Sequence, residues 1–272
     1  MSEADVVQQT PSPRTRSSLA SDLHELGLAP GMTVLVHSAL SSLGWVCGGS
    51  VAVVQALMDV LTPHGTLVMP THTGDLSEPS YWENPPVPQE WWDEIRETMP
   101  AYDPQITPTR MMGDIVETFR VWPGVLRSAH PSSSFAAWGM NAPFVIEYHA
   151  LDDSLGETSP LARIYDMEGW VLLLGVGYDN NTSFHLAEYR IPDATRIEQG
   201  APIFEDGRRV WKTYQDLDLD ADVFPTIGSE YEAQFPIRKG TVGSADSRLF
   251  PQREAVDFAL RWFSEKRNRD QC

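Results

Sequence analysis

The sequence predicts an α/β protein with a parallel sheet at its centre. Three short apolar runs, at 33–36, 66–69 and 171–174, are continuous rather than alternating, as in strands that are buried on both faces. A helical segment at 51–61 connects the first run to the second, which is the spacing of a strand, a crossover helix and a parallel strand. We therefore expect these two strands to lie in one parallel sheet.

The remaining elements follow from periodicity and from turn residues. Leu19, Leu23 and Leu26 lie at helical spacing and predict a helix over 18–28. Asp206 and Gly207 form a turn signal that predicts a hairpin over 202–214. A short strand is expected at 134–138, and further helices at 112–119, 159–165 and 253–266.

The chain shows no internal repeat and no low-complexity linker, so we expect a single domain over residues 17–272. Residues 1–16 are polar and contain two prolines, which predicts a mobile tail. The segment 71–109 is a long excursion rich in Pro, Trp, Tyr and acidic residues. A connection of this length is unusual unless it is functional, so we expect the excursion to contact the substrate.

The charge balance restricts the possible partners. The chain has 272 residues, of which 38 are acidic and 20 are Lys or Arg, for a net charge of −18. Nucleic acid is therefore not expected as a partner, because phosphate binding needs a basic surface. The negative charge serves either solubility or the attraction of a cationic substrate into an acidic cleft.

Features of membrane and secreted proteins are missing from the sequence. No apolar run approaches the roughly 20 residues of a membrane span, and the first residues do not resemble a signal peptide. The two cysteines, Cys47 and Cys272, lie far apart, so a disulfide framework is not expected. A reducing cytoplasm is the expected location.

His185 and Glu188 are the strongest candidates for chemistry. They follow the buried run at 171–174 and lie three residues apart, which places them on one face of a helix. The carboxyl edge of such a sheet is a common place for ligands. An imidazole supported by a carboxylate is a general base near neutral pH, and Asp179 is a second candidate for the support. A structural polar pair remains the alternative, and because the His-x-x-x-His spacing of helical zinc sites is missing, no metal is expected.

The loop at 37–50 is a candidate site for an anionic ligand. Gly44, Gly48 and Gly49 allow a close approach of the backbone, and the start of the following helix favours a group such as a diphosphate. The chain contains neither a dinucleotide-binding glycine motif nor a Walker lysine. An ordinary βα loop remains the alternative for 37–50. Elsewhere in the chain, Arg110 and Arg127 either bind phosphate or pair with acids.

Five segments taken together resemble the aminoglycoside 3-N-acetyltransferase family. They occur in the family's order and cover nearly the whole chain, from about residue 18 to 265. One departure is Ala39, where many members have Ser, so no side-chain hydroxyl acts at this position. The segments are VHSALSSLG at 36–44, GTLVMP at 65–70, RSAHP at 127–131, SPLA at 159–162, and LLLGVG at 172–177 with HLAE at 185–188.

The resemblance implies an acetyl-CoA-dependent transferase that acetylates the 3-amino group of the 2-deoxystreptamine ring of aminoglycosides and so confers antibiotic resistance. It also implies a three-layer α/β/α fold with a mixed, largely parallel sheet, distinct from the common small acetyltransferase fold. The catalytic residues are expected to be His185, Glu188 and Asp179. The residues expected at acetyl-CoA are His37, Ser38, Ala39, Leu40, Ser41, Leu43, Gly44, Thr109, Arg110 and Ser128. The residues expected at the aminoglycoside are Asp75, Glu78, Tyr81, Asp152, Asp153, Glu157 and Asn180.

Three alternatives remain at this point. The first is an acetyltransferase of the same family that acts on another amine. The second is a metal-dependent hydrolase that uses His185, and the third is a binding protein for cationic sugars. We expect the protein to be a monomer or a homodimer.

Overall fold

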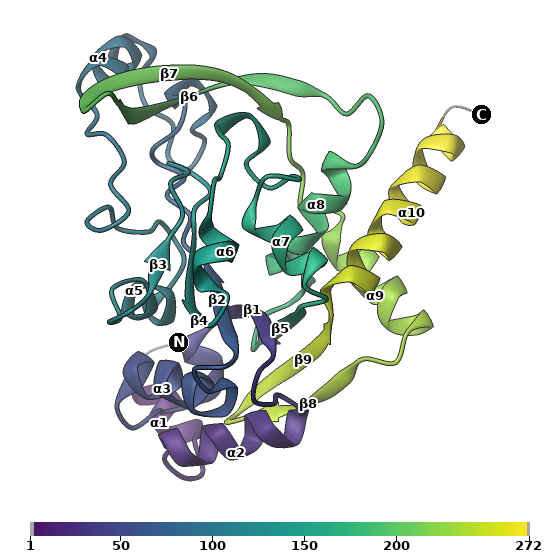
Figure 1. Cartoon of the computed structure of the whole chain (residues 1–272). Helices are drawn as coiled ribbons and strands as arrows, with labels where there is room; N and C mark the ends of the chain where they lie inside the picture. The colour runs from purple at the N-terminus through teal and green to yellow at the C-terminus, as the bar shows by residue number, and fades with distance from the viewer. Residues whose placement is uncertain (1–2, 271–272) are drawn as a thin grey trace.

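The computed structural model describes residues 3–270 and is built around a seven-stranded mixed sheet in the order β3-β4-β2-β1-β5-β9-β8 (Figure 1). The strands of the sheet are β1 (Thr33–Ser38), β2 (Thr66–Pro70), β3 (Leu126–Arg127), β4 (Phe135–Gly139), β5 (Trp170–Leu174), β8 (Arg238–Val242) and β9 (Ala245–Pro251). A separate two-stranded sheet consists of β6 (Arg196–Glu205) and β7 (Arg208–Leu217). The helices are α1 (Glu3–Gln9), α2 (Arg16–Leu26), α3 (Gly49–Leu61), α4 (Trp92–Thr98), α5 (Asp114–Arg120), α6 (Ala142–Ile146), α7 (Pro160–Asp166), α8 (Ser183–Tyr189), α9 (Phe224–Gln234) and α10 (Gln252–Asp270).

The centre of the sheet is parallel, as predicted. β1 pairs in parallel with β2 on one side and with β5 on the other, so the three apolar runs of the sequence are neighbouring strands. The outer strands β4, β3, β9 and β8 are antiparallel, which makes the sheet mixed. The three carboxyl ends of β2, β1 and β5 therefore meet at one edge.

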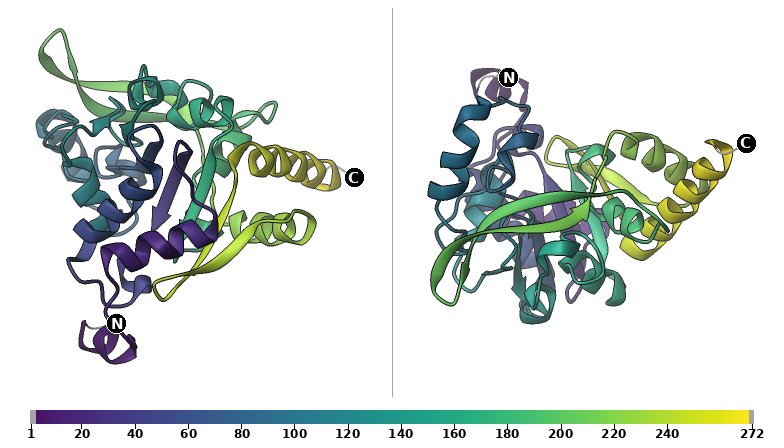
Figure 2. Two further views of the ribbon diagram at one scale, coloured as in Figure 1. Left: turned by 60° about the horizontal axis from the view of Figure 1, so that its bottom comes forward. Right: turned by 90° about the horizontal axis from the view of Figure 1, so that it is seen from above.

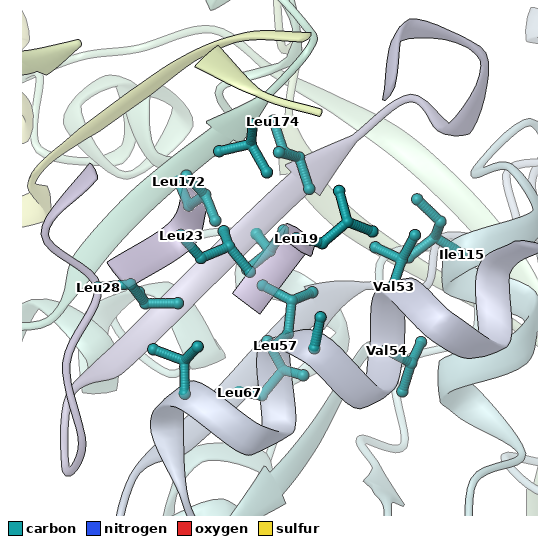
Figure 3. Packing of buried hydrophobic residues seen from close by; sticks show 14 of the residues in the cluster. Leu19, Leu23, Leu28, Val53, Val54, Leu57, Leu67, Ile115, Leu172 and Leu174 are labelled. Carbon is teal, nitrogen blue, oxygen red and sulfur yellow. The ribbon is translucent and has the colours of Figure 1, made fainter. Parts of the chain in front are cut away.

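Both faces of the sheet are covered, which confirms the α/β class. Val34 and Val36 of β1 belong to a core with α2, α3 and α5, whereas Leu35 belongs to a core with α6, α7, α8 and α10. Figure 3 shows the first core, where Leu19 and Leu57 lie between their helices and the sheet. Continuous apolar strands are explained by this arrangement, because each side chain points into one of two cores.

Local sequence signals set several helix ends. Thr15 and Ser18 form a capping box at the start of α2, and Gly27, with φ 105°, ends that helix. Ser159 caps α7, with Pro160 in its first turn. The predicted helix at 51–61 begins slightly earlier, at Gly49.

The predicted hairpin is present as β6 and β7, with Asp206 and Gly207 at positive φ in its turn. It lies across the top of the molecule in Figure 1 and over the rest of the chain in the second view of Figure 2. It contacts the excursion, since the backbone N–H of Tyr102 donates to the Pro202 carbonyl at 3.0 Å. The excursion at 71–109 contains α4 and short 3₁₀ turns.

The amino-terminal segment differs from the expected mobile tail. Residues 3–9 form α1, and Arg14 makes a parallel bridge with Val46 of the loop before α3. The backbone N–H of Trp45 also donates to Thr10 Oγ1 at 2.8 Å. These contacts attach the segment to the glycine-rich loop, a pairing that local periodicity does not show, and residues 1–2 lie outside the described part of the chain.

Among the described residues, no helix combines the length and the apolar composition needed to cross a membrane.

Candidate active site

The carboxyl ends of β1, β2 and β5 surround a small cavity of about 250 Å³. Ser38, at the end of β1, is in register with Leu174 of β5. The Ala39 N–H donates to the Leu174 carbonyl at 3.1 Å, which holds the two departing loops together. The polar residues that line the cavity are His37, Ser38, His72, Asp179, Asn180, Thr182 and His185.

His185 and Glu188 form a hydrogen-bonded pair on α8. The Nδ1 atom of His185 lies 2.5 Å from Glu188 Oε2. The other carboxylate oxygen, Oε1, accepts from the backbone N–H of Asp220 at 3.2 Å. The ring of Phe224 packs edge-on against His185 at 4.7 Å between centroids. These contacts fix the imidazole, and if Nδ1 donates to the carboxylate, Nε2 is the nitrogen that accepts a proton.

Asp179 has a different position from Glu188. It lines the same cavity as His185, but its carboxylate accepts from the side-chain amide of Asn180 at 2.9 Å. Glu188 is therefore the carboxylate that supports His185, and Asp179 faces the space in front of the imidazole.

A larger cavity of about 710 Å³ lies next to the small one. Five of the residues expected at acetyl-CoA line it: Ser38, Ala39, Leu40, Ser41 and Gly44. Gly49, the first residue of the 13-residue helix α3, also lines it, so the start of this helix borders the cavity, although the Gly49 N–H itself donates to the Val46 carbonyl. The two cavities are adjacent, because Ser38, Met111, Met112 and Asn180 line both of them.

Several residues expected at acetyl-CoA lie elsewhere. Leu43 is fully buried in the hydrophobic core, where it ends the 3₁₀ turn Leu40–Leu43. Ser128 is buried and bonded to His149, and Thr109 is bonded to Glu117. Neither lines either cavity. His37 lines the small cavity and not the larger one.

The two arginines also have roles of their own. Arg127 is buried and donates to the carbonyls of Thr71 and Thr107 at 2.8 and 2.5 Å, so it holds the excursion to the sheet. Arg110 lies in a third cavity of about 640 Å³, with its guanidinium 4.0 Å from the carboxylate of Asp75.

Of the acids expected at the aminoglycoside, Asp75 alone lines a cavity beside the site. Its cavity shares Met111 with the two cavities described above. The other acids have partners or positions elsewhere, and Tyr81 is an exposed residue that lines none of these three cavities. Glu78 pairs with Arg96 at 2.5 Å, Glu157 pairs with Arg190 at 2.7 Å, Asp153 accepts from the Thr158 N–H at 2.6 Å, and Asp152 lines a separate cavity with Lys212.

Two further histidines of the small cavity are neutral. Burial lowers the pKa of His37 to about 3. Burial, together with the nearby imidazoles of His185 and His37, lowers the pKa of His72 to about 3.

The sequence analysis did not select His72, Thr182, Met111, Met112 or Phe224. His72 carried a usable signal, because it lies just after the buried strand β2, as His37 lies at the carboxyl end of β1. The others come from loops and from α9, which only the tertiary structure brings to the cavity. Among the described residues, no group of three or more His, Cys, Asp or Glu side chains is arranged to hold a metal ion.

Comparison with known proteins identifies the class of this site. Residues 35–264 match the model of the family described as aminoglycoside 3-N-acetyltransferase. The chain is 54% identical over 259 residues to the SPbeta prophage-derived aminoglycoside N(3')-acetyltransferase-like protein YokD of Bacillus subtilis (strain 168), with 95% of each chain covered. The crystal structure of YokD superimposes with a TM-score of 0.94 and covers 96% of this chain and 97% of that one.

Two solved structures of related enzymes contain ligands. The binary structure of AAC-IIIb with CoASH has a TM-score of 0.83 and 32% identity, and covers 94% of this chain and 98% of that one. The structure of AAC-VIa bound to sisomicin has a TM-score of 0.84 and 31% identity, and covers 94% and 99%.

The fold and the site thus define an acyltransferase that uses acetyl-CoA as co-substrate. The chain belongs to the aminoglycoside 3-N-acetyltransferase family. The dimensions of the larger cavity and its glycine-rich wall suit an extended, anionic co-substrate.

Proposed function

We propose that this protein transfers the acetyl group of acetyl-CoA to the 3-amino group of the 2-deoxystreptamine ring of aminoglycosides, with His185 as general base and Glu188 as its support. The observation that carries this proposal is the His185–Glu188 pair in a small cavity that shares four lining residues with the larger, loop-lined cavity. The acetylated antibiotic loses a cationic group, which is the basis of resistance.

The reaction begins with removal of a proton, because an ammonium group has no lone pair for attack. His185 Nε2 accepts this proton, and the Glu188 carboxylate stabilises the imidazolium. Assistance of this kind is typically worth about 10²–10⁴-fold in rate. The amine nitrogen then bonds to the thioester carbon and the C–S bond breaks. The departing thiolate takes the proton held by His185, and the new amide nitrogen passes its surplus proton to the freed imidazole, which releases it to solvent.

The thioester oxygen gains negative charge during attack and needs a hydrogen-bond donor. The Ala39 N–H already donates to the Leu174 carbonyl, so it is not free to donate to this oxygen. Ser38 Oγ is buried without a hydrogen-bond partner among the described residues and lines both cavities. We assign the donor role to this hydroxyl.

The acidic surface suits a polycationic acceptor. The net charge of −18 favours approach of a cation, and Asp75 borders the neighbouring cavity. The structure of AAC-VIa, which is similar to this chain over nearly its whole length, contains sisomicin. We also propose a cytoplasmic location, where acetyl-CoA is available, a monomer or homodimer, and no role for nucleic acid.

The test is thiol release from acetyl-CoA with a panel of aminoglycosides, using the wild type, His185→Ala and Glu188→Ala. We expect aminoglycoside-dependent release that falls by at least about 10²-fold in His185→Ala. His64→Ala is the matched control, because His64 is exposed and lines none of the three cavities of the site. Release that survives in His185→Ala would refute the base assignment, and no release with any aminoglycoside would direct the search to other amines.

A further inference from the structure

Among the described residues, two histidines of the small cavity, His37 and His72, each have a buried ring nitrogen without a hydrogen-bond partner. His37 is the next-to-last residue of β1 and His72 follows β2, and both line the cavity that contains His185. Among the described residues, the Nε2 atom of each is buried and makes no hydrogen bond. A buried polar group that is left without a hydrogen bond destabilises the folded protein, so a ligand that pairs with it is favoured.

Two other buried histidines show what a structural role looks like here. His149 contacts Ser128 Oγ through Nδ1 at 3.0 Å and the Ser154 carbonyl through Nε2 at 2.6 Å. His130 accepts from the Ser133 N–H at 3.0 Å through Nδ1, and its Nε2 lies 3.3 Å from the Leu151 carbonyl. Both rings are satisfied by the protein on both nitrogens, whereas the two rings in the cavity are not.

The charge state of the two cavity histidines suits a cationic ligand. Because burial holds both pKa values near 3, the rings stay neutral at pH 7 and do not repel ammonium groups. A neutral imidazole nitrogen either donates or accepts a hydrogen bond, according to its tautomer. His185 is thus left as the imidazole that takes the proton of the reacting amine.

We propose that Nε2 of His37 and Nε2 of His72 bind two polar substituents of the ring that carries the reacting amine. This inference rests on the proposed function and deepens it. The cavity, at about 250 Å³, is smaller than typical pockets for whole drug-sized ligands of roughly 300–1,000 Å³, so one ring of the acceptor enters it. The acceptors selected are therefore amines flanked by hydroxyl or amino groups, and a plain monoamine leaves both nitrogens unpaired.

Mutagenesis tests the contribution of each nitrogen. His37→Phe and His72→Phe keep an aromatic ring and remove the nitrogens, His72→Gln restores a polar group, and His64→Phe is the exposed control. Each cavity variant should lower kcat/KM for sisomicin by about 10-fold, the equivalent of one lost hydrogen bond of about 1.4 kcal/mol. The KM for acetyl-CoA should not change, and His72→Gln should recover part of the loss.

A measurement on the wild-type protein tests the inference even if the variants fail to fold. In protein labelled with ¹⁵N-histidine, 2-deoxystreptamine should shift the Nε2 resonances of His37 and His72, and cyclohexylamine should leave them unchanged. Equal shifts with both amines, or an unchanged sisomicin KM in folded Phe variants, would overturn the inference while leaving the function intact. A wild type that neither turns over nor binds sisomicin in calorimetry would instead reject the proposed function, and with it this inference.

Discussion

Acid should destabilise this protein at a pH where the carboxylates are still ionised. The pKa of His37 and of His72 is about 3 in the folded chain, and that of His130 is about 4, in each case mainly because of burial. In the unfolded chain a histidine has a pKa of about 6.5. As the pH falls below this value, the unfolded state binds protons that the folded state does not, so folding stability falls with pH.

The size of the effect follows from the two pKa values. At pH 5 each of the three histidines favours the unfolded state by about 2 kcal/mol relative to pH 7.5, or about 6 kcal/mol in total. His149, whose pKa burial also lowers, acts in the same direction. Because domains are stable by only about 5–15 kcal/mol, a large share of the stability disappears before the carboxylates titrate.

Urea unfolding at a series of pH values, followed by tryptophan fluorescence, measures this loss. His37→Phe should reduce the loss between pH 7.5 and pH 5 by about 2 kcal/mol, whereas His64→Phe, at an exposed position, should not change it. A free energy of unfolding that varies by less than about 1 kcal/mol over this range would refute the reasoning, because the buried histidines would then be protonated in the folded protein.

Further predictions concern three side chains of the excursion and the loop that follows it. Asp75→Asn should raise the KM for an aminoglycoside about 2- to 5-fold, an effect that shrinks at high salt, because the carboxylate borders a cavity next to the site. Glu78→Gln should leave that KM unchanged and lower the thermal midpoint of unfolding, because Glu78 pairs with Arg96. Equal KM values for the wild type and Asp75→Asn would show that Asp75 does not contact the aminoglycoside. Met111→Gly should stabilise the fold by about 1 kcal/mol, because Met111 is 88% exposed and its φ of 58° strains the backbone of a residue with a side chain. Met111→Ala, which keeps this backbone strain, should not stabilise the fold. A lower urea midpoint for Met111→Gly than for the wild type would contradict this prediction.

Local patterns in the sequence determined the elements and the chemistry of the site. The continuous apolar runs required strands covered on both sides, so they became β1, β2 and β5 at the centre of the sheet. The spacing of His185 and Glu188 placed both on one face of a helix, and they form a hydrogen bond there. These features depend on residues that are near in sequence, where periodicity determines geometry.

Contacts between distant segments were decided by the tertiary structure alone. Glu188, and not Asp179, supports His185, and the N–H of Asp220, 32 residues further along the chain, holds that carboxylate. In the sequence, the acids at 152–157 and Asp75 were equally good candidates for binding a cation. In the structure, Glu157 pairs with Arg190 and Asp153 accepts from the Thr158 N–H, and none of these acids lines the small cavity. The reason is physical: the sequence lists charges and donors, but their partners depend on which loops the folded sheet brings to the same edge.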